Sequence, residues 1–304
     1  MAKKELVIAF ILILIFGLAT GVSTGETTNK AKIRINVGLR FLSLEAEVTD
    51  LISQYGGKLI RKSARLGVLT FKIPRVVFEN MVFDKNLSKL VEYIEEDYVR
   101  QIDLKDYKIY PGDESLGGME LYPNDPDYSL QWGPPCIGAE DAWDLELGSS
   151  EVIVAIVDTG IDLDHPDIVA NVDTSIDHDF VNNDDTAQDD HGHGTHVAGI
   201  VAAEINNSKG ITGLQQITLM AVKALNQGGL GFDSWLADGI VYAVDNGALV
   251  INCSWGNFFP SSTIRKAVNH AFDKGALVVA AAGNSGISGL IILPPTRRPL
   301  GLLL

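Results

Sequence analysis

The stretch EVIVAIVD, residues 151–158, decides the fold of the larger part of this 304-residue chain. It is an almost unbroken apolar run that ends on an aspartate, and such a run is typical of a strand buried on both faces of a sheet. Alternating patterns follow, with helices at 196–205, 233–247 and 263–275 and strands at 217–225, 248–256 and 276–284. This alternation predicts a doubly wound parallel α/β sheet.

Polar residues stand where three of these strands end. They are Asp158, the segment 254–256 and Asn284. Because ligands of open parallel sheets bind beyond the carboxyl ends of the strands, we expect these residues to share one site. We also expect Asp233 or Ser234 to cap the start of the helix at 233–247, and Gly247 to cap its end.

Residues 1–25 have the composition of a secretory signal peptide. Lys3 and Lys4 precede an apolar run from Leu6 to Phe16, and small residues follow as far as Gly25. The alternative is a membrane anchor, but the run is shorter than the ~20 residues that span a bilayer. We therefore expect a secreted, extracellular protein without stable membrane association once the signal is cleaved.

Charge and cysteine content narrow the function classes. A formal net charge of −15 argues against a nucleic-acid partner, because neutralising phosphates needs patches of Lys and Arg. Two cysteines, Cys136 and Cys253, do not make a disulfide scaffold. They are compatible with one disulfide, but we expect both to be small buried residues in a monomeric protein.

A second pattern precedes the parallel one. Residues 31–100 read as strand, helix, two strands joined near 65–67, helix and strand, the β-α-β-β-α-β order of a small ferredoxin-like domain. We place this α+β domain at residues 30–105. A Gly-, Pro- and Asp-rich linker follows at 106–121, and the α/β domain spans 122–290.

The segment DDHGHGTHVAGI, residues 189–200, holds three histidines and admits two interpretations. His191, His193 and His196 have the spacing of the zinc ligands of metallo-β-lactamase-like hydrolases, although that family has an aspartate where this chain has Thr195. Alternatively, one histidine at a helix start faces an aspartate and acts as a general base, which needs a single histidine.

Four ordered motifs resemble those of the subtilisin-like serine proteases: IVDTGIDLDHPD, HGTHVAGI, INCSWGN and AAAGNSG. The resemblance implies that Asp158 orients the base, that His193 is the base, and that the side chain of Asn284 donates to the oxyanion. It leaves His196 as a packed helix residue and His191 as a rim residue.

The same resemblance implies a groove in which an extended polypeptide substrate adds a strand. Its walls would be Gly228, Gly229, Leu230, Gly231, Ser254, Trp255 and Gly256. The pattern points to no particular substrate side chain. Residues 30–105 resemble the family's propeptide, which acts as an intramolecular inhibitor. Its last strand and the linker would lie in the groove until they are cleaved.

Two calcium sites are predicted, because hard oxygen ligands at close spacing suit Ca²⁺. The first resembles a calcium loop of thermitase-like subtilases and comprises Asp179, Asn182, Asp184, Thr186 and Gln188. The second is suggested by Asp125, Asp167 and Asn207. Residues 206–210 resemble the family's NNS-x-G loop, and this resemblance implies that the main-chain carbonyls of Ile205, Lys209 and Ile211 contribute. By composition alone the first stretch is also compatible with a solvated acidic loop.

The serine nucleophile of the family is expected in a GTS-x-[AS] motif downstream of Asn284, and this sequence has none. Only Ser285 and Ser288 follow Asn284, and residues 291–304 depart from the α/β pattern. We therefore interpret the sequence as a protease precursor truncated before its serine and inactive alone. The alternatives are a non-catalytic binding or inhibitory fragment and, more remotely, a zinc hydrolase.

Overall fold

The computed structural model describes residues 31–102, 123–257 and 259–284. The predicted signal peptide at 1–25, the linker at 106–121 and the aberrant tail at 291–304 lie outside these residues. Within them, no helix has the length and apolar composition needed to cross a bilayer.

Five parallel strands form the central sheet, as predicted. Their order is β11 (Leu277–Ala280), β10 (Val250–Cys253), β6 (Ile153–Asp158), β8 (Thr218–Lys223) and β7 (His178–Asp179). The strand β6 lies between β10 and β8 in the middle of the sheet. This position explains why its residues are apolar on both faces and do not alternate with polar ones. Chain order along the sheet reverses at β6, so the crevice beside Asp158 is the switch point of the fold.

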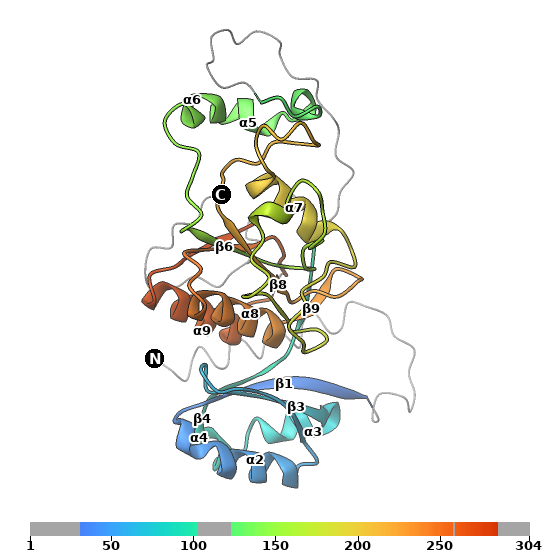
Figure 1. The fold of residues 1–304 in the computed structure, drawn as a ribbon. Helices are drawn as coiled ribbons and strands as arrows, with labels where there is room; N and C mark the ends of the chain where they lie inside the picture. Colours follow the sequence, from blue (N-terminus) through green and yellow to red (C-terminus); the bar gives the residue numbers. More distant parts are fainter. Residues whose placement is uncertain (1–30, 103–122, 258, 285–304) are drawn as a thin grey trace.

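Helices cover both faces of this sheet (Figure 1). The helix α7 (His193–Ala202) packs on one face, where Ala198 and Ala202 contact the strand residues Ile156 and Leu219. The helices α8 (Asp233–Asp245) and α9 (Ser262–Asp273) cover the other face, where Ile240 and Val268 join the core. The cores therefore lie above and below β6.

The N-terminal residues form a separate antiparallel sheet in the order β2-β3-β1-β4, with a core of its own. The chain runs through β1 (Lys32–Leu39), α2 (Glu45–Gln54), β2 (Lys58–Ser63), β3 (Val68–Pro74), α3 (Arg75–Met81), α4 (Leu87–Leu90) and β4 (Val91–Glu96). The single helix expected before β4 is wrong, because a turn separates α3 from α4. We call residues 32–102 the N-terminal domain.

Short elements complete the described chain. They are the 3-10 helices η2 (Leu42–Leu44), η3 (Tyr128–Leu130) and η4 (Val169–Asn171), the helices α5 (Gly133–Cys136) and α6 (Ala139–Trp143), and the strands β5 (Val99–Gln101) and β9 (Leu230–Phe232). Cys136 at the end of α5 is exposed and unpaired, so the expectation of two buried cysteines holds only for Cys253. The two thiols form no disulfide.

The last predicted strand of the N-terminal domain breaks into two. The strand β4 stays in its own sheet, whereas β5 leaves it and pairs antiparallel with β9 beside the parallel sheet. Buried Asp97 stands at the break, where Arg34 and Asn36 donate to its carboxylate at 2.8 and 2.9 Å. A strand pattern read along the sequence does not reveal this break, because both halves alternate alike.

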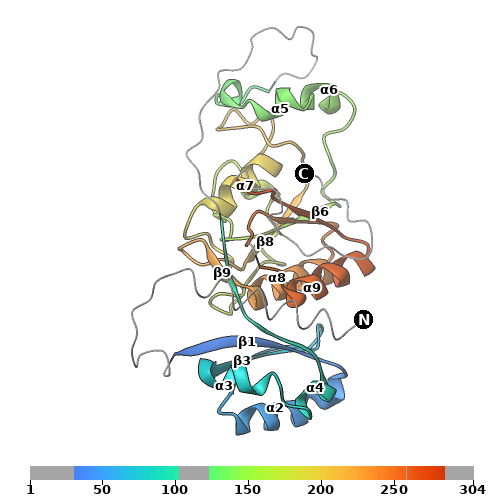
Figure 2. The ribbon, with the colours of Figure 1, turned by 180° about the vertical axis from the view of Figure 1, so that it is seen from behind.

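The helices α8 and α9 lie between the N-terminal sheet and the parallel sheet in opposite views (Figure 1, Figure 2). Their N-termini are capped from the N-terminal domain. The Asp97 carboxylate accepts from the Ser234 N–H at 2.9 Å, and Glu95 accepts from the N–H groups of Ser262 and Thr263 at 2.9 Å each. Four N–H groups at a helix start lack partners within the helix, so these carboxylates complete both helices.

The predicted caps of α8 are therefore wrong. Phe232 occupies the N-cap position and offers no side-chain hydrogen bond, while Asp233 is already helical. At the other end the C-cap is Asn246, one residue before Gly247. The sequence misses the cap because the acceptor, the carboxylate of Asp97, lies 137 residues from Ser234 along the chain.

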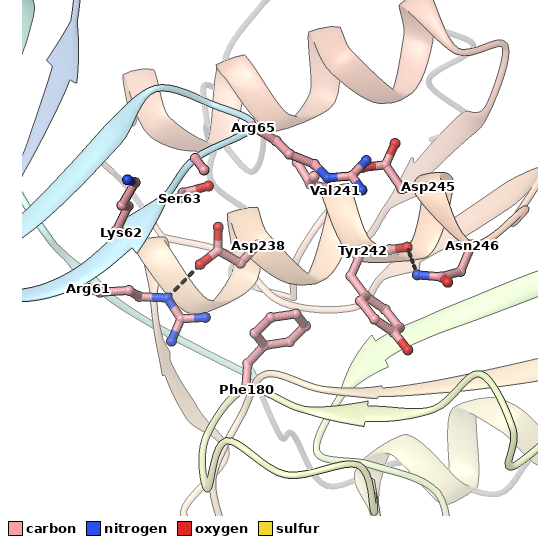
Figure 3. Close-up of a pocket in the computed structure, with 11 residues that line it drawn as sticks. Arg61, Lys62, Ser63, Arg65, Phe180, Asp238, Val241, Tyr242, Asp245 and Asn246 are labelled. Atoms are coloured by element: carbon pink, nitrogen blue, oxygen red, sulfur yellow. Dashed lines mark hydrogen bonds and ion pairs between the residues drawn. The ribbon is translucent and has the colours of Figure 1, made fainter. Parts of the chain in front are cut away.

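Ion pairs continue this contact along α8. Arg61 pairs with Asp238 at 2.5 Å, and Arg65 pairs with Asp245. These pairs border a pocket of about 360 Å³ between the β2–β3 hairpin and α8, with Phe180 and Tyr242 on its far side (Figure 3). The contact between the N-terminal domain and α8 therefore combines ion pairs with apolar side chains, since Leu66 and Val68 join the core that contains Ile240 and Val241.

Replacing the capping carboxylate Glu95 by alanine is expected to lower the free energy of unfolding by about 1–2 kcal/mol, because the start of α9 loses its acceptor. The matched control is Glu92→Ala, which removes only a half-exposed ion pair with Lys266 and is expected to cost at most about 0.5 kcal/mol. Chemical denaturation of both variants measures the difference. Equal losses would contradict the capping role of Glu95.

Candidate active site

Asp158 and His193 meet at the carboxyl end of β6. Asp158 is fully buried, and its Oδ1 atom lies 2.7 Å from the Nδ1 atom of His193, the first residue of α7. The Thr159 N–H donates to the same oxygen at 2.8 Å. The imidazole is 16% exposed and keeps its Nε2 atom for another partner. A histidine held in this way by a carboxylate is a general base of fixed orientation.

Gly192 lets the chain turn into α7 at this point. Its φ of 98° lies in the left-handed region that favours glycine. At Gly194, an added Cβ would lie 2.1 Å from the carbonyl oxygen of Gly160. The helix start therefore approaches the end of β6 more closely than any larger residue allows, and this brings the His193 ring to Asp158.

Asp189 holds this arrangement together, a role that the sequence reading missed. One carboxylate oxygen accepts from the N–H groups of His191 and Gly192 and from the Thr159 hydroxyl at 2.8–2.9 Å. The other accepts from the N–H and hydroxyl of Thr195 at 3.0 and 2.6 Å. Asp189 thus connects the end of β6 to the first turn of α7. The only sequence signal for this role is its position shortly before the HGTH segment, residues 193–196.

The pKa of His193 is raised above its ordinary value of 6.5. Burial of the ring acts in the opposite direction, but the hydrogen bond from Asp158 and the charges of Asp158 and Asp189 outweigh it. The Oδ2 atom of Asp158 is buried and has no hydrogen-bond partner among the described residues. The buried charge of Asp158 therefore depends on His193 for compensation, and the dyad favours the imidazolium form.

The other predicted catalytic residue, Asn284, lies beyond the end of β11, which is separated from β6 by β10 alone. It is exposed, and its predicted role as an oxyanion donor stays a prediction.

The strand β5 occupies the predicted substrate groove. On one side Arg100 and Gln101 pair with Gly231 and Leu230 of β9. On the other side Gln101 and Gly256 exchange N–H···O bonds of 3.4 and 3.2 Å. The chain of the N-terminal domain thus lies as a central strand between two segments of the α/β domain. An extended segment bound on both edges through its backbone is how a peptide adds to a sheet.

Glycine shapes one wall of this groove. Gly229 has a φ of +68°, and its carbonyl accepts from the Ile102 N–H at 3.2 Å. An added Cβ there would lie 2.7 Å from the Ile102 side chain. Within the described ranges of the chain, the predicted wall residues Gly228 and Ser254 make no hydrogen bond to β5. The Trp255 indole points into the core and donates to the Val157 carbonyl at 2.8 Å. Trp255 therefore supports β6 and is no side-chain contact for substrate.

The geometry does not support the zinc interpretation of the three histidines. His193 is engaged with Asp158, and His191 lies partly buried beside it, with ring centroids 6.4 Å apart. His196 is exposed, so its expected packing role is wrong. In the described part of the chain, no three side chains of His, Cys, Asp or Glu gather as metal ligands.

The predicted calcium ligands Asp125, Asp167 and Asn207 do come together. The two carboxylates are 4% and 3% exposed, and both accept from the loop that contains Asn207. Among the described residues neither carboxylate has a basic side chain within ion-pair distance. Two buried, unneutralised carboxylates beside one loop fit a divalent cation with oxygen ligands.

The other predicted calcium loop is less well assembled. The carboxylate of Asp179 accepts from the N–H of Val181 and from Asn182, within its own turn. Gln188 uses its amide with Leu163 and Asp162, away from Asp184 and Thr186. The structure therefore brings Asp179 and Asn182 together but directs Gln188 elsewhere.

Comparisons with known proteins place these features in a family. Residues 149–297 match the model of the subtilase family, Peptidase_S8. The thermophilic serine proteinase of Bacillus sp. (strain AK1) is 43% identical over 212 residues, which are 69% of this chain and 48% of that protein. Thermitase of Thermoactinomyces vulgaris is 49% identical over 166 residues, 54% of this chain and 58% of that protein.

A solved structure extends the likeness over more of the chain. Fervidolysin from Fervidobacterium pennivorans, a keratinolytic enzyme related to subtilisin, matches with a TM-score of 0.71 and 25% identity, covering 88% of this chain and 42% of that one. The present chain spans about half the length of the curated relatives that it matches.

The Asp158→Asn substitution is expected to lower the pKa of His193, because burial of the ring then acts without the opposing carboxylate of Asp158. NMR titration of the imidazole signals measures this directly. Asp185→Asn, which removes the partner of His178 instead, serves as the control and leaves the His193 titration unchanged. An unaltered pKa in Asp158→Asn would show that the two side chains are not coupled in solution.

Proposed function

Residues 149–297 are a domain of the subtilase family (peptidase S8), homologous to thermitase, and from this premise we propose that the chain is the precursor of a secreted, subtilisin-like serine endopeptidase. Members of this family are serine endopeptidases. Export rests on the composition of residues 1–25, and a relative of 33% identity, Nep of Natrialba magadii, is described as extracellular. The observation that carries the proposal is the Asp158–His193 dyad at the end of a peptide-binding groove.

In this proposal His193 moves the proton and Asp158 keeps the ring in place. The Nε2 atom takes the proton of a serine hydroxyl as the serine oxygen bonds to the scissile carbonyl carbon. Asp158 stabilises the imidazolium, which then gives the proton to the leaving amine as the C–N bond breaks. Water hydrolyses the acyl-enzyme by the same route, and Asn284 donates a hydrogen bond to the oxyanion.

The serine is the element that residues 1–304 do not supply in the family's motif. We propose that these residues alone cleave no peptide, because the oxyanion site without a nucleophile gives little catalysis. What they retain is the dyad and the groove. The contact of β5 with both walls of that groove supports a capacity for binding extended polypeptide.

The N-terminal domain is proposed to be a ferredoxin-like propeptide that inhibits the site in cis. Three contacts support this role: the caps that Asp97 and Glu95 give to α8 and α9, the ion pairs of Arg61 and Arg65 with α8, and the seat of β5 in the groove. A strand that fills the groove excludes substrate. The caps and ion pairs of this contact exchange readily with water, and we propose that the domain separates once its link is cut.

Calcium is proposed as a structural ion at Asp125, Asp167 and Asn207. The buried, unneutralised pair of carboxylates supports this site, and the carbonyls of Ile205, Lys209 and Ile211 are proposed to complete it. A second ion at Asp179, Asn182, Asp184, Thr186 and Gln188 would require Gln188 to turn away from Leu163. A bound cation would neutralise the carboxylates and fix the loops that carry them.

Catalysis is testable in a chimera that joins residues 1–284 to the part of thermitase that follows its matching asparagine. Cleavage of a fluorescent casein is expected, and His193→Ala should reduce kcat/KM at least about a thousandfold. His196→Ala, one turn along the same helix and exposed, is the matched control and should stay within about twofold. A folded chimera without activity, or equal losses in both variants, would refute the role of the dyad.

Calcium binding is testable by the melting temperature of the 304-residue chain. Adding a chelator is expected to lower it by about 5 °C or more, because the loss of bound ion removes a few kcal/mol. Asp167→Asn should abolish most of this response, whereas Asp164→Asn, an exposed neighbour, should preserve it. If wild type and Asp167→Asn respond alike to chelator, the ion is not bound at this site.

A further inference from the structure

Arg100 is buried in the groove although arginine is seldom fully buried. Its side chain and that of Asp233 are both 0% exposed. The Nε atom of Arg100 donates to one carboxylate oxygen of Asp233, and Nη2 donates to the other at 3.2 Å. The same Nη2 atom donates to the main-chain carbonyl of Phe259 at 3.1 Å. The α/β domain therefore encloses a guanidinium group that belongs to the segment lying in its groove.

In residues 99–102, buried and exposed side chains alternate, as in a strand with one face toward the groove. Arg100 and Ile102 are buried, whereas Val99 and Gln101, which alternate with them, are exposed. The backbone bonds of β5 to Gly229, Leu230, Gly231 and Gly256 are independent of side-chain identity. Selection among peptides must therefore come from the positions whose side chains point inward, as in other cases of strand addition.

Asp233 has the placement of a recognition group. It is the first helical residue of α8, where a carboxylate is favoured by the helix dipole, and its N–H donates to the Tyr98 carbonyl at 2.9 Å. Burial raises the pKa of Asp233 to about 6, and the charge of Arg100 opposes this rise. The charged carboxylate thus depends on a cation beside it, since an unpaired buried charge is costly.

The contacts suit arginine rather than lysine. Nε and Nη2 meet the two carboxylate oxygens side by side, and Nη2 reaches a carbonyl in a different segment. A planar fork of donors satisfies this set, whereas a lysine ammonium is a point charge that cannot span both oxygens and the carbonyl with the same geometry. Phe259 also stacks on Tyr98, with ring centroids 5.1 Å apart.

We propose that the groove contains an arginine-selective subsite, formed by the Asp233 carboxylate and the Phe259 carbonyl. Arg100 fills this subsite in the precursor, and an arginine of a polypeptide substrate fills it in the mature enzyme. The preferred substrate sequence is Arg-x-Ile, the pattern that Arg100 and Ile102 form in this chain. This proposal rests on the proposed function, since it names a substrate class for the same groove.

The first experiment treats β5 as a tethered substrate in the full chain. Hydrogen exchange at the Gln101, Ile102 and Gly256 amides reports how often β5 leaves the groove. Arg100→Gln and Arg100→Lys are expected to speed this exchange at least about tenfold, because each leaves Asp233 imperfectly paired. Val99→Ala, at the exposed neighbouring position, should leave it unchanged. Equal exchange in Arg100→Gln and wild type would overturn the subsite.

The second experiment asks whether a separate peptide uses the subsite. In the full chain, Arg100→Asp combined with Ile102→Asp should expel β5 by placing carboxylates against Asp233 and Gly229, and fast exchange at Gly256 confirms an open groove. Labelled peptides YVRQI, the sequence of residues 98–102, are then added with arginine, lysine or citrulline at the third position. Fluorescence anisotropy should show the arginine peptide binding at least about tenfold more tightly than either analogue.

The Asp233→Asn exchange in the same background should abolish this preference, and circular dichroism checks that each variant is folded. If arginine and citrulline peptides bind equally well, the arginine subsite is overturned while the peptide groove stands. If the groove is open and no peptide binds, the groove itself is overturned, and with it the basis of the proposed function.

Discussion

The hydrogen bond between Asp158 and His193 is the constraint on which the rest of the site depends. It joins the end of a fully buried strand to the first residue of α7, and it leaves one carboxylate oxygen without a partner among the described residues. Such a buried charge is tolerated only while a cation or donor faces it. The glycines at 192 and 194 and the Asp189 network hold the helix close enough for this, so their role is geometric rather than chemical.

Electrostatics of the same kind contributes to the contact between the two halves of the chain, beside the apolar packing of Leu66 and Val68. The N-terminal domain gives carboxylates to the starts of α8 and α9 and takes carboxylates from α8 with Arg61 and Arg65. Apolar burial makes most stable interfaces permanent, whereas ion pairs and caps exchange readily with water. Such caps and ion pairs suit the proposed role of a domain that folds with its partner and later leaves it, and the pocket beside Asp238 marks where packing is incomplete.

Recognition in the groove divides between backbone and side chain. Pairing with β9 and Gly256 holds any extended segment, and the glycine at 229 admits a buried side chain close to the main chain. Asp233 adds a requirement for one side chain, because its carboxylate is enclosed together with a guanidinium. In such a groove, hydrogen bonds to the peptide backbone supply the affinity, and the buried carboxylate of Asp233 supplies the selectivity among side chains.

The sequence by itself determined the parallel sheet, since the apolar run ending at Asp158 is typical of a strand buried on both faces and strands alternate with helices after it. The family motifs also pointed to Asp158 and His193. The sequence did not determine the break at Asp97, the cap of α8, the exposure of His196 or the ion pair of Arg100 with Asp233. Each of these depends on residues that are distant along the chain, such as Asp97 and Ser234, or on which side of an element faces solvent. Local periodicity records the burial of an element's own face, whereas caps and buried ion pairs arise only when the tertiary structure brings two segments together.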